Sequence, residues 1–167
     1  MQAHRPFRPE IQGLRAIAVM AVLCFHVWPS LLPGGYIGVD VFFVISGYLI
    51  TGHLFREARS EGTISLAAFY VRRMKRLLPA ATLVLIVVAC ATPLLPETRW
   101  DETSAQIAAS ALFIENWALA WLATDYLRSQ NPPSPVQHFW SLSVEEQFYL
   151  LWPVTILAAI AIGKRLH

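Results

Sequence analysis

The sequence predicts an all-α fold, a polytopic transmembrane helix bundle with four full spans and one ambiguous or re-entrant apolar segment. Of its 167 residues, 56% are hydrophobic and 14% are charged, and the mean hydropathy is +0.48. Soluble domains usually carry about 25% charged residues. The apolar residues also gather into runs close to the ~20 residues that are needed to cross the hydrocarbon core of a bilayer. Composition and run length together predict a membrane protein.

Four apolar runs are the expected spans: Ala16–Leu32, Tyr36–Phe55, Leu77–Leu95 and Gln147–Ile162. Pro33-Gly34-Gly35 is expected to form a tight turn between the first two. Pro79 is expected in the first turn of the third helix, where a missing N–H does least harm. No small-x-small cleavage site follows the first run, which argues against a removable signal peptide.

The segment Ser104–Ala123 is the ambiguous one, because Gln106, Glu115 and Asn116 interrupt it. Positive charges, which mark the cytoplasmic side of membrane proteins, lie at Arg5, Arg8, Arg15, Arg56, Arg59, Arg72, Arg73, Lys75 and Arg76. The N-terminus, with residues 1–11 as a tail, is therefore expected in the cytoplasm. Lys164 and Arg165 fall on the same side only if Ser104–Ala123 does not cross. Four spans are therefore favoured, with Pro96–Glu145 outside and partly embedded in the membrane.

Several classes of function find no support in the sequence. The net charge of +2 is too small to indicate a nucleic-acid partner. There is no nucleotide-binding loop, no Gly-x-Ser-x-Gly elbow and no metal-ligand spacing, so no metal is expected. Cys24 and Cys90 lie in apolar runs, where they are expected to be small buried hydrophobes. Residues 1–167 are expected to be the front portion of a longer membrane domain.

Arg15 and His26 are the first candidate site residues. They are eleven residues apart, and in a helix this spacing puts both on nearly the same face, about 16 Å apart along the axis. An elongated ligand with an anionic end and a reactive end could contact both. Arg15 alone could be an interfacial anchor whose charge reaches out of the membrane. His26 alone could form a helix–helix hydrogen bond, although ionisable residues at membrane depth are a functional hypothesis by default.

Supporting candidates lie on the second and the last spans. Asp40 lies about one turn inside the second helix and could orient His26, and Ser46 follows on the same helix. Ser143-x-x-Glu146 fits a capping box, which gives Glu146 a structural explanation. Glu145 also suits a helix start, where acidic residues are favoured.

The stretch "FYVRRMKRLLP" contains three arginines that could bind an anion, Arg72, Arg73 and Arg76. Planar guanidinium groups suit phosphate oxygens. Arg72 and Arg76 would share one face of a helix. Simple anchoring on the cytoplasmic side explains Lys75 equally well.

Four stretches together resemble the N-terminal half of the acyltransferase-3 family of bacterial integral-membrane O-acyltransferases. In order they are "GLRAIAVMAVLCFH", "GGYIGVDVFFVISGYLIT", "FYVRRMKRLLPA" and "HFWSLSVEEQFYLLWP". The last is most similar to the O-antigen and peptidoglycan O-acetyltransferase branch of the family, which implies lipopolysaccharide or another envelope polysaccharide as the acceptor. The resemblance implies that His26 is catalytic and that Arg15, Arg72, Arg73 and Arg76 bind acetyl-CoA, the acyl donor.

The same resemblance implies partners and a location. The acceptor would be a hydroxyl of a cell-envelope glycan or lipid-linked sugar, and the protein would be a multi-pass protein of the bacterial cytoplasmic (inner) membrane in contact with its lipid. A later acidic residue of the family has no counterpart here, so a C-terminal half or a second subunit would be needed. Two alternatives stay open: an inactive membrane fragment, and a transporter-like bundle with His26 and Asp40 as a proton relay.

Overall fold

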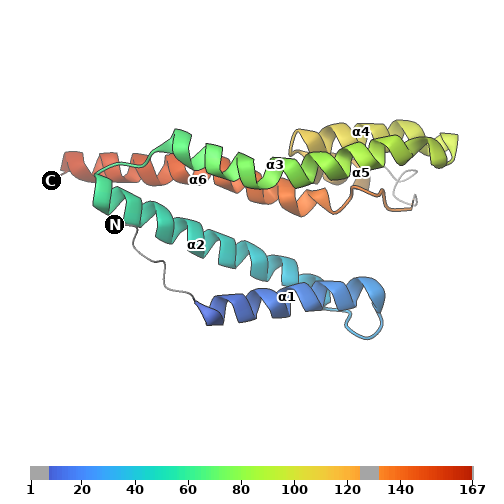
Figure 1. The fold of residues 1–167 in the computed structure, drawn as a ribbon, viewed down its shortest axis with the longest axis horizontal. Coiled ribbons are helices and arrows are strands. Elements are labelled where there is room, and N and C mark those ends of the chain that lie inside the picture. The colour runs from blue at the N-terminus through green and yellow to red at the C-terminus, as the bar shows by residue number, and fades with distance from the viewer. Residues whose placement is uncertain (1–7, 125–131, 167) are drawn as a thin grey trace. The chain divides into compact units, whose positions relative to one another are not determined.

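Two groups of helices make up the computed structural model, which describes residues 8–124 and 132–166. The first group, within residues 1–62, contains α1 (Pro9–Val27), the short 3₁₀ turn η1 (Gly35–Ile37) and α2 (Gly38–Glu61). The second, within residues 63–167, contains α3 (Leu66–Ala91), η2 (Thr92–Leu94), η3 (Glu97–Arg99), α4 (Trp100–Ala111), α5 (Glu115–Ala123) and α6 (Phe139–Leu166) (Figure 1). The described residues contain no strand. The predicted all-α class is confirmed.

Four helical segments are long and apolar enough to cross a membrane: Pro9–Val27, Gly35–Glu61, Leu66–Leu94 and Phe139–Gly163. They match the four predicted spans, and they make the chain a multi-pass membrane protein. Their bounds differ from the apolar runs. α1 ends at Val27 rather than Leu32, and α3 begins at Leu66, so Pro79 lies inside that helix. The prediction that Pro79 occupies a first turn is therefore wrong.

In the first group, α1 and α2 form an antiparallel hairpin, which Figure 1 shows joined by a short connection. Two glycines allow the close approach. A Cβ at Gly35 would lie 2.3 Å from the Ala21 carbonyl oxygen, and one at Gly38 would lie 2.4 Å from the Ala18 carbonyl oxygen. Any other side chain at either position would overlap the backbone of α1. Farther along the pair, the Arg8 guanidinium donates to the Tyr48 hydroxyl at 2.5 Å.

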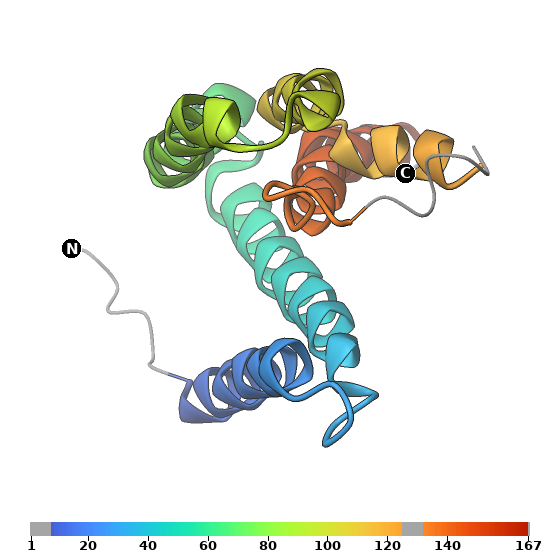
Figure 2. The same ribbon diagram turned by 90° about the vertical axis from the view of Figure 1, so that its right-hand side faces the viewer.

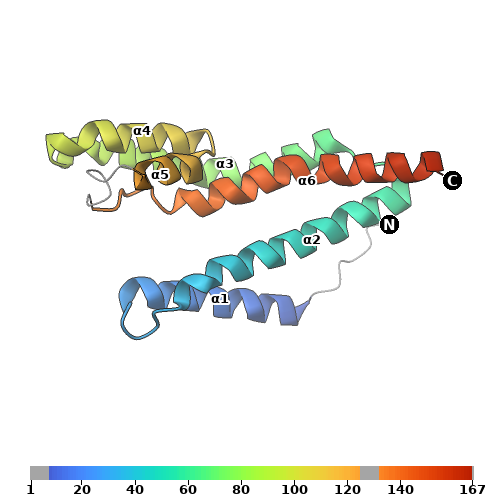
Figure 3. The ribbon, with the colours of Figure 1, turned by 180° about the vertical axis from the view of Figure 1, so that it is seen from behind.

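In the second group, α3 and α6 lie side by side, and α4 and α5 pack near one end of this pair (Figures 1 and 3). Figure 2 shows α3 nearly end-on, with α4 next to it. Ala81 of α3 packs in an apolar cluster with Val136 and Phe139, where the chain enters α6. The Tyr70 hydroxyl donates to the Leu150 carbonyl oxygen at 2.8 Å, which ties α3 to α6.

The ambiguous segment Ser104–Ala123 is divided between α4 and α5. The 12 residues of α4 cover about 18 Å and the nine of α5 about 14 Å, each short of the ~30 Å hydrocarbon core. Between them Phe113 adopts a left-handed backbone with φ of 55°. The Gln147 amide of α6 donates to the Phe113 carbonyl oxygen at 2.8 Å and to Asn116 Oδ1 at 2.9 Å. These two hydrogen bonds from Gln147, here called the Gln147 latch, hold the turn between α4 and α5. Neither helix is long enough to cross the membrane by itself.

Candidate functional site

Arg15 and His26 both lie on α1, as predicted. The helix is continuous from Pro9 to Val27, so eleven residues separate the two side chains by about 16 Å along one face. Arg15 is half-buried and His26 is exposed. Among the described residues, Arg15 has no hydrogen-bond or ion-pair partner, and the guanidinium is therefore available to an anion.

The His26 ring has one nitrogen that is engaged and one that is free. Nδ1 lies 2.8 Å from the Val22 carbonyl oxygen. A carbonyl only accepts, so a neutral ring in this contact carries its proton on Nδ1 and an unprotonated lone pair on Nε2. Phe25 meets the ring edge-on at 5.4 Å between centroids and meets Tyr36 at 5.8 Å. The described residues provide no partner for Nε2, so this atom can act as a base.

The supporting candidates on α2 do not contact His26. Asp40 lies in the first turn of α2, is exposed, and makes no hydrogen bond or ion pair with a described residue. Gly38, two residues before it, already lies against Ala18 of α1. The antiparallel course of α2 carries Asp40 still farther from His26. Ser46 is half-buried within the same helix.

The three arginines lie on α3 and face in two directions. Arg72 and Arg76 are exposed, whereas Arg73 is half-buried. The Cζ atom of Arg73 lies 3.5 Å from the centroid of the Tyr149 ring on α6. The basic stretch predicted to connect two spans is therefore part of a helix, and one of its arginines is turned toward α6.

The two acidic candidates lie within α6. This helix begins at Phe139, four residues before Ser143, so the predicted capping box of Ser143 and Glu146 is wrong. The Ser143 hydroxyl instead accepts from the Glu115 backbone N–H at 3.3 Å. The Tyr149 hydroxyl donates to Glu145 one turn earlier. Glu146 attracts Arg73 electrostatically but forms no ion pair with it within the described residues.

Glu115 is a buried carboxyl group that was not among the predicted site residues. Its side chain is 0% exposed, and neither carboxylate oxygen has a hydrogen-bond partner in the described chain. Burial raises the pKa of Glu115 to about 7, and the nearby Ser110 hydroxyl, which makes no hydrogen bond of normal geometry, acts in the opposite direction. The only signal in the sequence is that Glu115 interrupts an apolar run.

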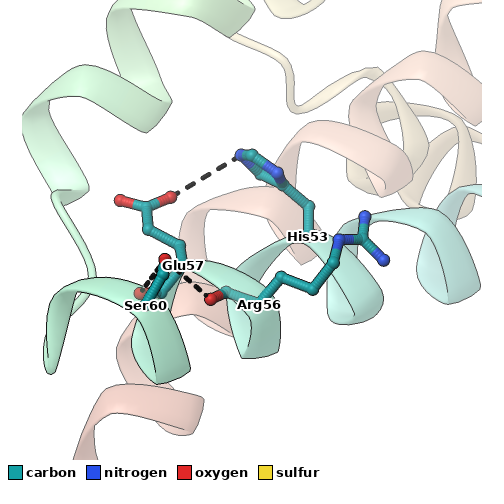
Figure 4. Close-up of polar contacts among 4 residues, drawn as sticks. All are labelled: His53, Arg56, Glu57 and Ser60. Carbon is teal, nitrogen blue, oxygen red and sulfur yellow. Dashed lines mark hydrogen bonds and ion pairs between the residues drawn. The ribbon is translucent and has the colours of Figure 1, made fainter. Parts of the chain in front are cut away.

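A second histidine lies near the end of α2. His53 Nε2 is 3.6 Å from Glu57 Oε2, and Ser60 Oγ donates to the Arg56 carbonyl oxygen at 3.0 Å (Figure 4). All four residues belong to one helix, and the contacts are one turn apart. They are the contacts expected of a helix that stabilises its own C-terminal turns. His53 therefore serves as a natural control for His26.

Two further observations limit the chemistry. A cavity of about 280 Å³ in the second group is lined by Ala89, Thr92, Pro93, Trp100, Ser104 and Ile107, none of which titrates near neutral pH. No group of three or more His, Cys, Asp or Glu that could hold a metal occurs in the part of the chain that the structure describes.

Comparison with known proteins matches residues 8–166 to a family model described as an acyltransferase domain. A Staphylococcus aureus (strain MSSA476) protein provisionally named as an O-acetyltransferase is 41% identical over 95% of this chain and 26% of its own length. The peptidoglycan O-acetyltransferase OatA of Listeria monocytogenes is 39% identical over 92% of this chain and 25% of its own length. YrhL of Bacillus subtilis, provisionally named as a peptidoglycan O-acetyltransferase, is 39% identical over 96% and 25%.

The matches cover nearly all of this chain but only part of each relative. The chain spans about a quarter of the length of these relatives. The names that specify an acceptor give peptidoglycan, not lipopolysaccharide. No solved structure matches. Because the family model covers nearly the whole chain, this multi-pass membrane protein belongs to the acyltransferase family that the model describes.

Proposed function

We propose that this chain takes part in acetyl transfer from acetyl-CoA to a hydroxyl group of a cell-envelope glycan. Peptidoglycan is the favoured acceptor, because two relatives carry it in their names. The site would belong to the bacterial cytoplasmic membrane, with the N-terminus in the cytoplasm, where acetyl-CoA is made. This orientation follows from the excess of arginine and lysine near the N-terminus and on α3. A C-terminal half or a second subunit would complete the catalytic site.

One observation carries the proposal: His26 has a free Nε2 on the same helix face as Arg15. The hydrogen bond from Nδ1 to the Val22 carbonyl fixes the ring in the tautomer that a general base requires. An imidazole can both accept and return a proton during one turnover. Arg15 has no partner in the described chain and adds a positive charge about 16 Å away. Coenzyme A has phosphates at one end and the thioester at the other, which suits this separation.

The proposed reaction needs no co-reactant beyond donor and acceptor. His26 Nε2 accepts the proton of the glycan hydroxyl, and the hydroxyl oxygen attacks the thioester carbonyl carbon. The carbon–sulfur bond breaks as the new ester bond forms. The imidazolium then returns the proton to the departing coenzyme A sulfur, and the base is regenerated.

The arginines of α3 are proposed to bind the phosphates of the donor. Guanidinium groups hold phosphate oxygens through paired hydrogen bonds in one plane. Arg72 and Arg76 are exposed one turn apart, and Arg73 is held against α6. Replacing all three with glutamine should remove the thermal stabilisation of the purified protein by acetyl-CoA. If acetyl-CoA does not raise the melting temperature of the wild-type protein, the proposed donor is wrong.

The proposed role of His26 is tested in cells that express the chain at its natural level. The readout is the ester-linked acetate that mild alkali releases from purified peptidoglycan. A positioned base contributes about 10²–10⁴-fold to a rate, so His26→Ala should reduce the acetate to the level of a gene deletion. His53→Ala is the matched control and should leave it unchanged, because His53 lies on α2 and its Nε2 contacts Glu57 one turn later on that helix. Unchanged acetate in the His26 variant would refute the role of this residue.

A further inference from the structure

The guanidinium group of Arg73 is held in one place by an aromatic ring. Its Cζ atom lies 3.5 Å from the centroid of the Tyr149 ring, well within the range of a cation–π contact. Tyr149 is 3% exposed, so the ring itself is a fixed part of α6. Two helices meet here, because Arg73 belongs to α3 and Tyr149 to α6.

The Tyr149 ring is also fixed at its far end. Its hydroxyl donates to the Glu145 carboxylate one turn earlier on α6. Next to Tyr149 in the chain, the Leu150 carbonyl oxygen accepts a hydrogen bond from the Tyr70 hydroxyl, which is a separate contact between the two helices. Tyr149 is therefore a rigid surface for Arg73, and its position does not depend on the arginine.

The hydrogen-bond donors of Arg73 remain unused. None of its N–H groups has a hydrogen-bond partner among the described residues, and Nε is buried. The Cζ atom of Arg73 lies over the ring, and the five N–H groups of a guanidinium all lie in the plane of that group, where they can donate to a ligand at its edge. A buried charged donor without a partner is costly, so the arrangement favours a ligand that accepts hydrogen bonds.

A purely structural role for Arg73 would predict a different geometry. Glu145 and Glu146 both lie on the helix that Arg73 faces, yet neither forms an ion pair with it in the described chain. Glu145 instead accepts from Tyr149. Glu146 attracts Arg73 from beyond ion-pair distance. The arginine is thus oriented by the ring while its donors stay open.

We infer that Tyr149 is a positioning residue, which holds Arg73 ready to bind an oxyanion through its in-plane N–H groups. This rests on the proposed function, in which the oxyanion is a phosphate of the acyl-CoA donor. The inference also gives the three arginines of α3 different roles. Arg73 is half-buried and pre-organised by Tyr149, whereas Arg72 and Arg76 are exposed.

The test measures the dissociation constant of free coenzyme A for the purified chain in detergent, with melting temperature as a check on folding. Tyr149→Leu removes the ring contact and should weaken binding about tenfold, the range of a partly desolvated cation–π contact. Tyr149→Phe keeps the ring but loses the bond to Glu145, and should stay within about threefold of wild type. Tyr70→Leu is the matched control, since it removes another α3–α6 contact without touching Arg73.

A double-mutant cycle separates positioning from general damage. Arg73→Gln and Tyr149→Leu together should weaken binding no more than Arg73→Gln alone. Fully additive losses, an equal loss in Tyr70→Leu, or unchanged binding in Tyr149→Leu would each overturn the inference. Absence of coenzyme A binding by the wild-type chain would overturn it too.

The ligand itself provides a second comparison. S-acetylpantetheine has the thioester but lacks the adenosine phosphates, so its binding should not depend on Arg73 or Tyr149. Equal dependence for both ligands would contradict a phosphate contact. Coupled binding of coenzyme A together with unchanged acetate in the His26 variant would leave this inference standing and refute the proposed catalytic role. The two ideas can therefore fail separately.

Discussion

The ionisation of Glu115 should lower the stability of the second helix group as the pH rises. The carboxyl group is completely buried, and no described Arg, Lys or His pairs with it. Burial disfavours the charged form and raises the pKa of Glu115 from 4.5 to about 7. The folded protein therefore keeps this proton up to a higher pH than the unfolded chain does.

The size of the effect follows from linkage. Below pH 4.5 the group is protonated in both states, and above about pH 7 it is ionised in both. Between these values the folded state binds more protons, so stability falls as the pH rises. The interval corresponds to at most about 3 kcal/mol, at ~1.4 kcal/mol per pH unit.

Glu115→Gln isolates this contribution, because glutamine has a similar shape and does not titrate. We expect the stability of this variant relative to wild type to increase by up to about 3 kcal/mol between pH 4.5 and pH 7.5, or on the order of 10 °C in melting temperature. Thermal unfolding in detergent, followed by tryptophan fluorescence, measures the difference. Glu97→Gln, at an exposed acidic residue of the same helix group, is the control.

A constant difference between Glu115→Gln and wild type across this pH range would refute the argument. So would an equal pH-dependent gain in Glu97→Gln. If the stability of Glu115→Gln relative to wild type instead increased toward low pH, Glu115 would be stabilised in its charged form, which would require a cation near it.

Two substitutions test the packing described above. Gly38→Ala should destabilise the α1–α2 hairpin by about 1–3 kcal/mol, because its Cβ would lie 2.4 Å from the Ala18 carbonyl oxygen. Gly13→Ala is the control and should not destabilise the hairpin, because nothing lies within 4 Å of a Cβ at that position. Equal melting temperatures for the two variants would contradict the close approach of the helices. Gln147→Leu should cost about 1–3 kcal/mol, because the Phe113 carbonyl and Asn116 lose their partner. Hydrogen exchange should then increase in residues 111–117 first, and uniform exchange would contradict a local latch.

The four spans could be predicted from the sequence because apolar length alone determines them. Hydropathy could not locate their ends. α3 continues from Leu77 back to Leu66 through the basic stretch, because arginine and lysine are good helix formers outside the hydrocarbon. Pro79 therefore lies inside a helix although it begins an apolar run. Proline is tolerated in such helices where neighbours satisfy the freed carbonyl.

The predictions about site residues that were wrong have a common cause: contacts with other helices, which the sequence pattern does not show, decide where these side chains lie. Ser143 matches a capping motif, but α6 begins four residues earlier, and the hydroxyl bonds the backbone of Glu115 instead. Arg73 looks equivalent to Arg72 in the sequence, yet one residue turns the side chain by about 100° and brings it to α6. In contrast, the spacing of Arg15 and His26 is local to one helix, so it could be predicted from residue numbers alone.

The connection between α1 and α2 has a consequence for how the chain enters the bilayer. Residues 28–37 contain no Asp, Glu, Lys or Arg, and the hairpin closes on itself through Gly35 and Gly38. Moving a single charged residue through the centre of a membrane costs about 2.5–3.5 kcal/mol on insertion scales. Because this loop carries none, it can cross the bilayer without that cost when the two helices insert together, and Asp40 in the first turn of α2 is a charge next to it that must cross as well. His26, at the end of α1, would reach its final depth in the same step.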